Sequence, residues 1–151
     1  MIHMIPLPYP LNALEPYYNK ETLEIHYHTL YKGYVDNTNK TLEKLEKARL
    51  NNQFESIKCL ERDLSFYGSG AILHELFFTN MGVPMPSLPS NALMEQIIKD
   101  FGSFDKCQNQ FIEAAKTVEA SRLVHFSMGT KFSEIRNLTM RKAPKLNSMG
   151  M

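Results

Sequence analysis

Apolar positions recur at helical spacing over two long stretches of the chain. The first is residues 20–50, and its apolar residues are Leu23, Ile25, Leu30, Tyr34, Val35, Leu42 and Leu45. The second is residues 54–81, which read "FESIKCLERDLSFYGSGAILHELFFTNM". Apolar residues that return every three to four positions are typical of amphipathic helices. The pattern predicts two long helices, which pack against each other as an antiparallel hairpin.

Prolines and N-cap residues mark the ends of the predicted helices. Residues 1–19 are rich in proline, which favours an extended chain, and Asn19 is a candidate N-cap before the first helix. The segment "MGVPMPSLPSN" indicates a linker. Two shorter helices are predicted after it, "ALMEQIIKDFG" and "SFDKCQNQFIEAAKTVEAS", with Ser103 as the N-cap of the second.

Composition narrows the classes of function. The 151 residues are 43% hydrophobic with a formal net charge of +1, so a core is expected and no charge pattern indicates nucleic acid or acidic lipid. The N-terminus lacks a basic region before its prolines, and no apolar run nears the roughly 20 residues of a membrane span. Cys59 and Cys107 lie far apart, which favours reduced thiols over a disulfide. We expect a cytoplasmic protein without nucleic-acid or membrane partners.

Two histidines are candidate metal ligands. His26, Leu30 and Tyr34 follow the spacing i, i+4, i+8 and are expected on one helix face. His74 lies in "AILHELFF", on the second predicted helix, so an antiparallel hairpin would let His26 and His74 face each other. A catalytic metal usually has three or more protein ligands, and no HExxH or CxxC motif is present. A buried hydrogen-bonding role for each histidine remains the alternative.

A family resemblance covers residues 5–121. "LPYPLNALEPYYNKETLEIHYHTLYKGYVDN" resembles the opening of the iron/manganese superoxide dismutase family, and "FYGSGAILHELFFTNMG" is similar to the helix with its second ligand. "FGSFDKCQNQFIEAAKTVEAS" resembles the helix that follows. The resemblance implies a mainly α fold, in which the long antiparallel hairpin precedes the first helices of a truncated α/β domain. It implies that His26 and His74 bind manganese or iron and that Tyr34 gates the access of superoxide.

The chain departs from the family at single positions. The family often has His where this chain has Leu30 and Trp where it has Phe78, so hydrogen bonding around the metal is expected to differ. Gly70 stands where many iron-type members have Gln, so the match leans toward manganese. A homodimer is left open.

The tail after Ser121 is expected to be unlike the family. The family's remaining Asp and His ligands lie in a "DxWEHAY" segment, whereas residues 122–151 contain no Asp, and His125 has no matching context. We therefore expect three parts: a helical-hairpin domain over 1–85, the helices of a C-terminal domain over 86–121, and a non-family tail over 122–151. Little regular structure is expected in this tail, which would leave Ile97 and its apolar neighbours short of packing partners.

A slip of reading frame after Ser121 would explain such a tail. Met-Gly is encoded ATG-GGN, which contains TGG, a Trp codon, one base further on; Met128–Gly129 and Met149–Gly150 therefore each hide a Trp. Permitted codons for the tail, read in that frame, give a "SGW" start like the family's. An unrelated natural extension is the alternative, and the coding DNA around Ser121 decides between the two.

The functional expectation follows from the ligand count. An intact family member converts superoxide to dioxygen and hydrogen peroxide at a manganese or iron site. This chain keeps two of four protein ligands, so it should bind metal weakly and be inactive alone. The alternatives are a site completed by another chain and a helical-hairpin interaction module without redox activity.

Overall fold

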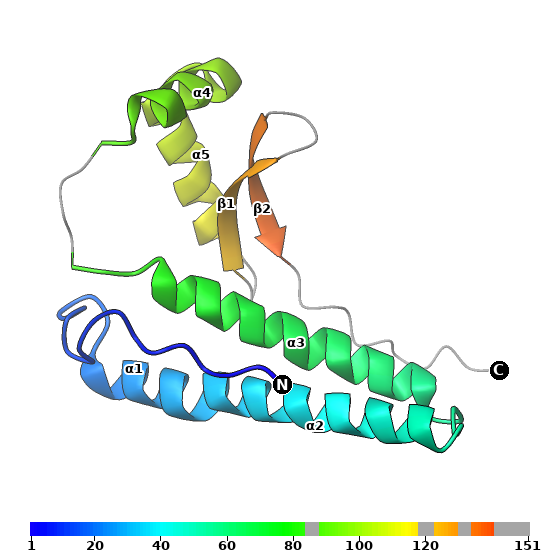
Figure 1. Ribbon diagram of the computed structural model, residues 1–151. Coiled ribbons are helices and arrows are strands. Elements are labelled where there is room, and N and C mark those ends of the chain that lie inside the picture. The colour runs from blue at the N-terminus through cyan, green and yellow to red at the C-terminus, as the bar shows by residue number, and fades with distance from the viewer. Residues whose placement is uncertain (84–87, 118–122, 130–133, 141–151) are drawn as a thin grey trace. The chain divides into compact units, whose positions relative to one another are not determined.

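The computed structural model describes residues 1–83, 88–117, 123–129 and 134–140. The chain divides into two compact units, Met1–Met85 and Pro86–Met151. Each is described by itself below. Figure 1 shows the elements of both units in chain order.

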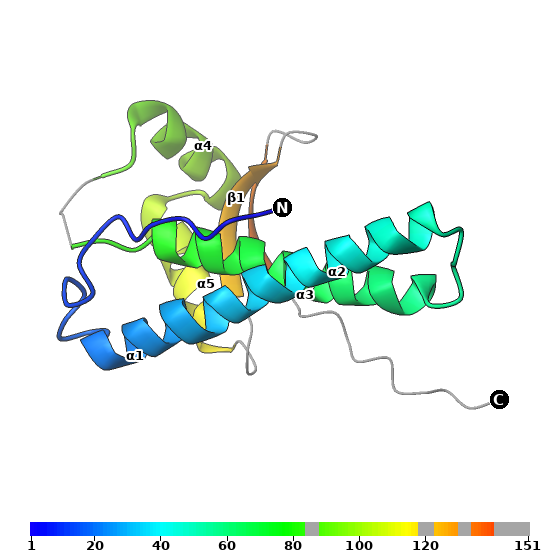
Figure 2. The same ribbon diagram turned by 60° about the horizontal axis from the view of Figure 1, so that its bottom comes forward.

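The first unit is a long helical hairpin. One arm consists of α1 (Lys20–Ile25), a π-helical turn η1 (His26–Tyr31) and α2 (Lys32–Leu50), and the other arm is α3 (Ile57–Thr79). The two arms lie side by side and run in opposite directions (Figures 1 and 2). The side chain of Asn19 accepts a hydrogen bond from the backbone N–H of Thr22 and so caps α1, as the sequence predicted. The mainly helical fold with an antiparallel hairpin is therefore confirmed.

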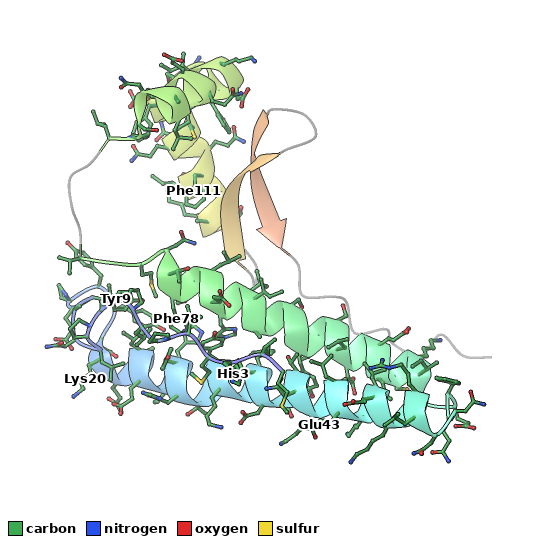
Figure 3. All side chains as sticks on the ribbon, in the orientation of Figure 1. His3, Tyr9, Lys20, Glu43, Phe78 and Phe111 are labelled. Atoms are coloured by element: carbon green, nitrogen blue, oxygen red, sulfur yellow. The ribbon has the colours of Figure 1, made fainter. Side chains whose placement is uncertain are left out.

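The core of this unit lies where the N-terminal segment meets both arms. The buried residues are Leu14, Leu23, Tyr27, Tyr31, Val35, Ala71 and Phe78. The N-terminal segment runs along the hairpin, and the Tyr9 hydroxyl donates to the carbonyl of Phe78 at 3.0 Å (Figures 2 and 3). At its start, the Asn39 side chain exchanges two hydrogen bonds with the backbone of Ile2. These bonds fix an otherwise irregular segment against the helices.

The second unit begins with two amphipathic helices, α4 (Asn91–Phe101) and α5 (Phe104–Lys116). Gly102, with a φ of 84°, ends α4 in the left-handed conformation that glycine adopts without strain. The Ser103 side chain then accepts from the backbone N–H of Lys106, which confirms the predicted cap. Ile97 is only 2% exposed and packs with Cys107, so the expectation that Ile97 lacks packing partners is wrong.

The tail contains a β-hairpin, which corrects the expectation of little regular structure. Strands β1 (Leu123–Gly129) and β2 (Glu134–Met140) pair antiparallel, with Leu123 opposite Met140 and Gly129 opposite Glu134. Both strands contact α5. The segments "LVHFSMG" and "EIRNLTM" hold residues such as Val124, Phe126 and Ile135 that favour strands, and a search for helical periodicity alone overlooks them. The end of the second predicted short helix, at residues 118–121, lies outside the described residues.

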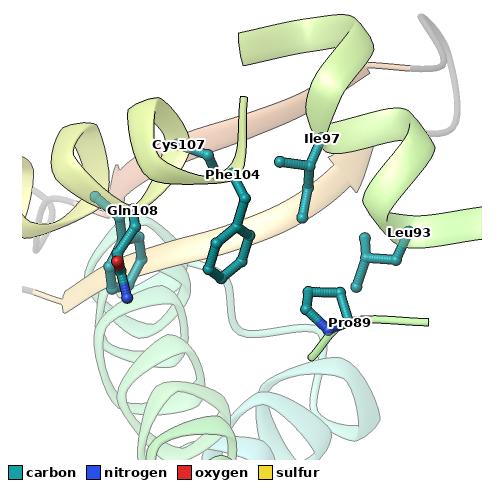
Figure 4. Close-up of a pocket in the computed structure, with 7 residues that line it drawn as sticks. Pro89, Leu93, Ile97, Phe104, Cys107 and Gln108 are labelled. Carbon is teal, nitrogen blue, oxygen red and sulfur yellow. The ribbon is translucent and has the colours of Figure 1, made fainter. Parts of the chain in front are cut away.

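An apolar groove lies between α4 and α5 (Figure 4). It is lined by Pro89, Leu93, Ile97, Phe104, Cys107, Gln108 and Phe111. Burial raises the pKa of the Cys107 thiol, which therefore stays protonated near neutral pH. A groove of this composition offers no convergent set of metal ligands. Among the described residues, no helix combines the length and apolar content that a bilayer crossing requires.

Candidate metal centre

His26 and His74 meet across the seam of the hairpin. Their ring centroids lie 5.0 Å apart and their planes cross at 82°. A metal about 2.1 Å from each Nε2 would be about 3.2 Å from each centroid, which places two centroids about 4.5–5.2 Å apart at ligand angles of about 90–110°. The observed separation lies in this range. The structure thus brings together the two residues that the sequence paired, at a distance compatible with one shared ion.

A backbone carbonyl determines which nitrogen of His74 is protonated. His74 Nδ1 lies 2.6 Å from the carbonyl oxygen of Gly70, one turn earlier on α3. A carbonyl only accepts hydrogen bonds, so Nδ1 must carry the proton and donate. In the neutral ring, Nε2 then keeps its lone pair, which is the form in which histidine binds a metal.

A phenol takes the corresponding place beside His26. The hydroxyl of Tyr18 lies 2.8 Å from His26 Nδ1. Burial lowers the pKa of His26, and the nearby His74 lowers it further. A lowered pKa favours the neutral imidazole near physiological pH. Both candidate ligands therefore have Nδ1 engaged in a hydrogen bond, which leaves Nε2 as the nitrogen suited to metal.

Aromatic rings surround the two imidazoles. Phe77 and Phe78 have centroids 5.2 and 5.1 Å from that of His26. Tyr31, which is 1% exposed, stacks on His74 with an interplanar angle of 3°. Phe78 is fully buried. Rings of this kind limit water at the site and hold the imidazoles in place.

Tyr34 lies beside His74 and against a glycine. Its ring centroid is 4.8 Å from that of His74. A Cβ built on Gly70 would overlap the Tyr34 ring, so this close approach requires glycine. Gly70 thus serves the site in two ways, since its carbonyl also accepts from His74.

The π turn η1 aligns His26 with Tyr34. A regular α-helix turns by about 100° per residue, so eight residues would rotate Tyr34 about 80° away from the direction of His26. A π turn takes up one extra residue, so the same eight residues advance by about 700°, close to two full turns. Both rings consequently contact His74. Leu30, four residues after His26, is 51% exposed.

The described residues supply half of a typical metal site. No group of three or more His, Cys, Asp or Glu side chains converges within the described part of the chain. The neutral, oriented imidazoles fit manganese or iron as two of its ligands. His125 lies in β1 with its backbone opposite Leu138. The sequence did not indicate that Tyr18 and Tyr31 contact the candidate ligands. For Tyr18, the one available signal was its position directly before the predicted cap Asn19.

Family models match both parts of the chain. The alpha-hairpin domain of iron/manganese superoxide dismutases matches residues 2–82, and their C-terminal domain matches residues 89–149. The second match continues past Ser121, where the sequence analysis placed the end of the resemblance, and this part of the expectation is corrected. The frame slip itself stays a prediction.

Individual relatives are similar over most of the chain. An iron superoxide dismutase of Pyrobaculum aerophilum is 44% identical over 76% of this chain and 55% of its own length. A manganese/iron superoxide dismutase of Aeropyrum pernix is 34% identical over 97% of this chain and 69% of its own length. A manganese superoxide dismutase of Haloferax volcanii is also 34% identical, over 91% and 68%. The chain spans little more than half of the first of these relatives. On its fold and these matches, the chain belongs to the iron/manganese superoxide dismutase family.

Proposed function

We propose that His26 and His74 form half of a mononuclear manganese or iron site of the superoxide dismutase type. The observation that carries the proposal is their approach to 5.0 Å with both Nδ1 atoms engaged by Tyr18 and Gly70. Two imidazoles held in this way act as neutral nitrogen donors from the two arms of the hairpin. A bound manganese or iron ion would supply the change of oxidation state that superoxide dismutation needs.

Tyr34 is proposed to control access to this site. Its ring is half-buried next to His74, and Gly70 leaves the space that it needs. A phenol in this position is large enough to restrict entry to a small anion such as superoxide. Its hydroxyl can also exchange hydrogen bonds with solvent or substrate.

The chain of 151 residues, taken alone, is proposed to be inactive. Two protein ligands leave the metal under-coordinated, and residues 122–151 contain no Asp to complete the site. Purified chain loaded with manganese or iron should therefore show negligible dismutation of superoxide. Robust dismutation that disappears in His26→Ala would overturn this part of the proposal.

The choice of metal is proposed to lean toward manganese. The preference rests on Gly70, because the family resemblance puts it where many iron-type members have Gln. The relatives above are named for iron, manganese or both. Equimolar competition between Mn²⁺ and Fe²⁺ without oxygen, followed by metal analysis, tests it. An excess of iron in the recovered protein would reverse the preference.

We also propose that the protein is located in the cytoplasm.

A second candidate is a site completed by another chain, such as a second copy of this one. It is favoured by three exposed apolar residues that lie close in sequence to His26 or His74: Ile25, Leu30 and Ile72 are 54%, 51% and 60% exposed. Exposed apolar surface of this kind is common at contacts between chains. Dismutase activity that rises with the fraction of dimer, measured by light scattering, would favour this candidate over an inactive single chain.

A further inference from the structure

We infer that Tyr18 is a positioning residue whose hydroxyl sets the tautomer and the orientation of the His26 imidazole. The inference rests on the proposed function for its purpose, because it matters only where His26 binds a metal. The geometry that carries it is the 2.8 Å hydrogen bond between the Tyr18 hydroxyl and His26 Nδ1. A metal bound at Nε2 requires a proton on Nδ1, which then donates to the Tyr18 oxygen.

The backbone before α1 fixes the place of Tyr18. Its N–H donates to the carbonyl of Leu14 at 3.0 Å, and the next residue, Asn19, caps the helix. Tyr18 therefore occupies the position before the N-cap, from which a side chain commonly packs onto the first turn of a helix. Its ring joins the cluster around Leu23 and meets Phe77 edge-on at 6.4 Å. With the ring held at one end, the hydroxyl reaches His26, eight residues along the chain.

Other tyrosines of the same core have different partners. The hydroxyls of Tyr9 and Tyr27 donate to the backbone carbonyls of Phe78 and Ile5. Such bonds fasten the N-terminal segment and are structural. Tyr18 contacts an imidazole instead, and its hydroxyl is able to accept as well as donate. It can therefore accept from an Nδ1-protonated His26 ring, which is the role that we assign to it, whereas the Gly70 carbonyl beside His74 can only accept.

The chemical consequence concerns the lone pair that a metal needs. In water a neutral imidazole prefers the proton on Nε2, which blocks metal binding there. A hydrogen-bond acceptor at Nδ1 reverses this preference and also prevents the ring from turning. Loss of such a partner typically weakens metal affinity by about 10–100-fold. The Tyr18 ring also stays in contact with Phe77, so removal of the hydroxyl alone should leave the packing in place.

The test compares Tyr18→Phe with two matched controls in the full chain. Tyr17→Phe makes the same change at the adjacent tyrosine, which is 86% exposed. Tyr9→Phe removes a hydroxyl that bonds to a carbonyl of the same core. Long-range ¹H–¹⁵N correlation spectra of the metal-free chain report which nitrogen of His26 is protonated, with His26→Gln used to assign the signals. The dissociation constant for Mn²⁺ is then measured for each variant.

We expect the Nδ1-protonated tautomer in the unaltered chain and a shift toward the Nε2-protonated form in Tyr18→Phe alone. The Mn²⁺ dissociation constant should rise about 10–100-fold in Tyr18→Phe and change little in the controls. An unchanged His26 tautomer in Tyr18→Phe, or an equal shift in Tyr9→Phe, overturns the role of Tyr18. If the unaltered chain binds no Mn²⁺ while the tautomer still responds to Tyr18→Phe, the role of Tyr18 stands and the metal site of the proposed function fails.

Discussion

The ring of Tyr34 occupies the space where any residue other than glycine at position 70 would have its β-carbon. This contact joins the two arms of the hairpin next to the candidate ligands, because Tyr34 lies on α2 and Gly70 on α3. The Gly70 carbonyl also accepts from His74. A change at Gly70 therefore affects both Tyr34 and His74.

Gly70→Ala should destabilise the hairpin, whereas Gly68→Ala should not. Alanine gains about 1 kcal/mol over glycine in a helix interior, but overpacking against Tyr34 costs about 1–3 kcal/mol. At Gly68 a new Cβ would meet Leu64 and Thr38 at an ordinary 4.0 Å, so the helical gain remains. We expect a loss of up to about 2 kcal/mol for Gly70→Ala and a gain of up to about 1 kcal/mol for Gly68→Ala. Urea unfolding measures both, and equal effects would contradict the proposed contact.

Phe78→Ala should be among the most damaging changes in the first unit. Phe78 is 0% exposed and its ring contacts His26, Tyr27 and Tyr31. Truncation of a buried Phe costs about 3–5 kcal/mol. Phe54, which is 45% exposed, is the matched control and should lose about 1 kcal/mol or less. Thermal unfolding followed by far-UV circular dichroism separates the two, and similar losses would place Phe78 outside the core.

Acidification should destabilise the metal-free hairpin through His26. The folded-state pKa of His26 lies below the ordinary value of 6.5, so the folded chain disfavours the charged ring. Above pH 6.5 both states are neutral at His26; below it the unfolded chain takes up the proton first, and stability falls as the pH falls.

Stability measured from pH 7.5 to 5 with a chelator present shows this effect. His26→Gln should flatten the pH dependence, and the exposed His28 provides a control, His28→Gln, that should keep it. A pH dependence that is the same in all three proteins would mean that burial of His26 has no effect on its titration.

Local chemistry made much of the fold predictable. Both arms of the hairpin, the caps Asn19 and Ser103, and the pairing of His26 with His74 follow from helical spacing and capping residues. The π turn was not predictable in this way, because an apolar pattern read at 3.6 residues per turn assumes no inserted residue. In the structure Tyr31 is buried, whereas Leu30, the residue before it, is 51% exposed.

The remaining differences arise from contacts distant in sequence. The bond from Tyr18 to His26 depends on how the segment before α1 folds back, and no periodicity describes such a segment. The strands β1 and β2 are short, and each is stabilised by its pairing with the other. The sequence of either segment alone does not indicate this pairing. A β-hairpin is therefore less visible in a single sequence than a helix of 19 or 23 residues.

Binding of Mn²⁺ tests the central claim most directly. The full chain is titrated with Mn²⁺ while electron paramagnetic resonance reports the free ion, beside His26→Ala, His74→Ala and the control His28→Ala. The account predicts weak binding of one ion per chain, an affinity at least about tenfold lower in His26→Ala and in His74→Ala, and an unchanged affinity in His28→Ala. Absence of binding in the unaltered chain, or binding that survives the loss of either histidine, would contradict it.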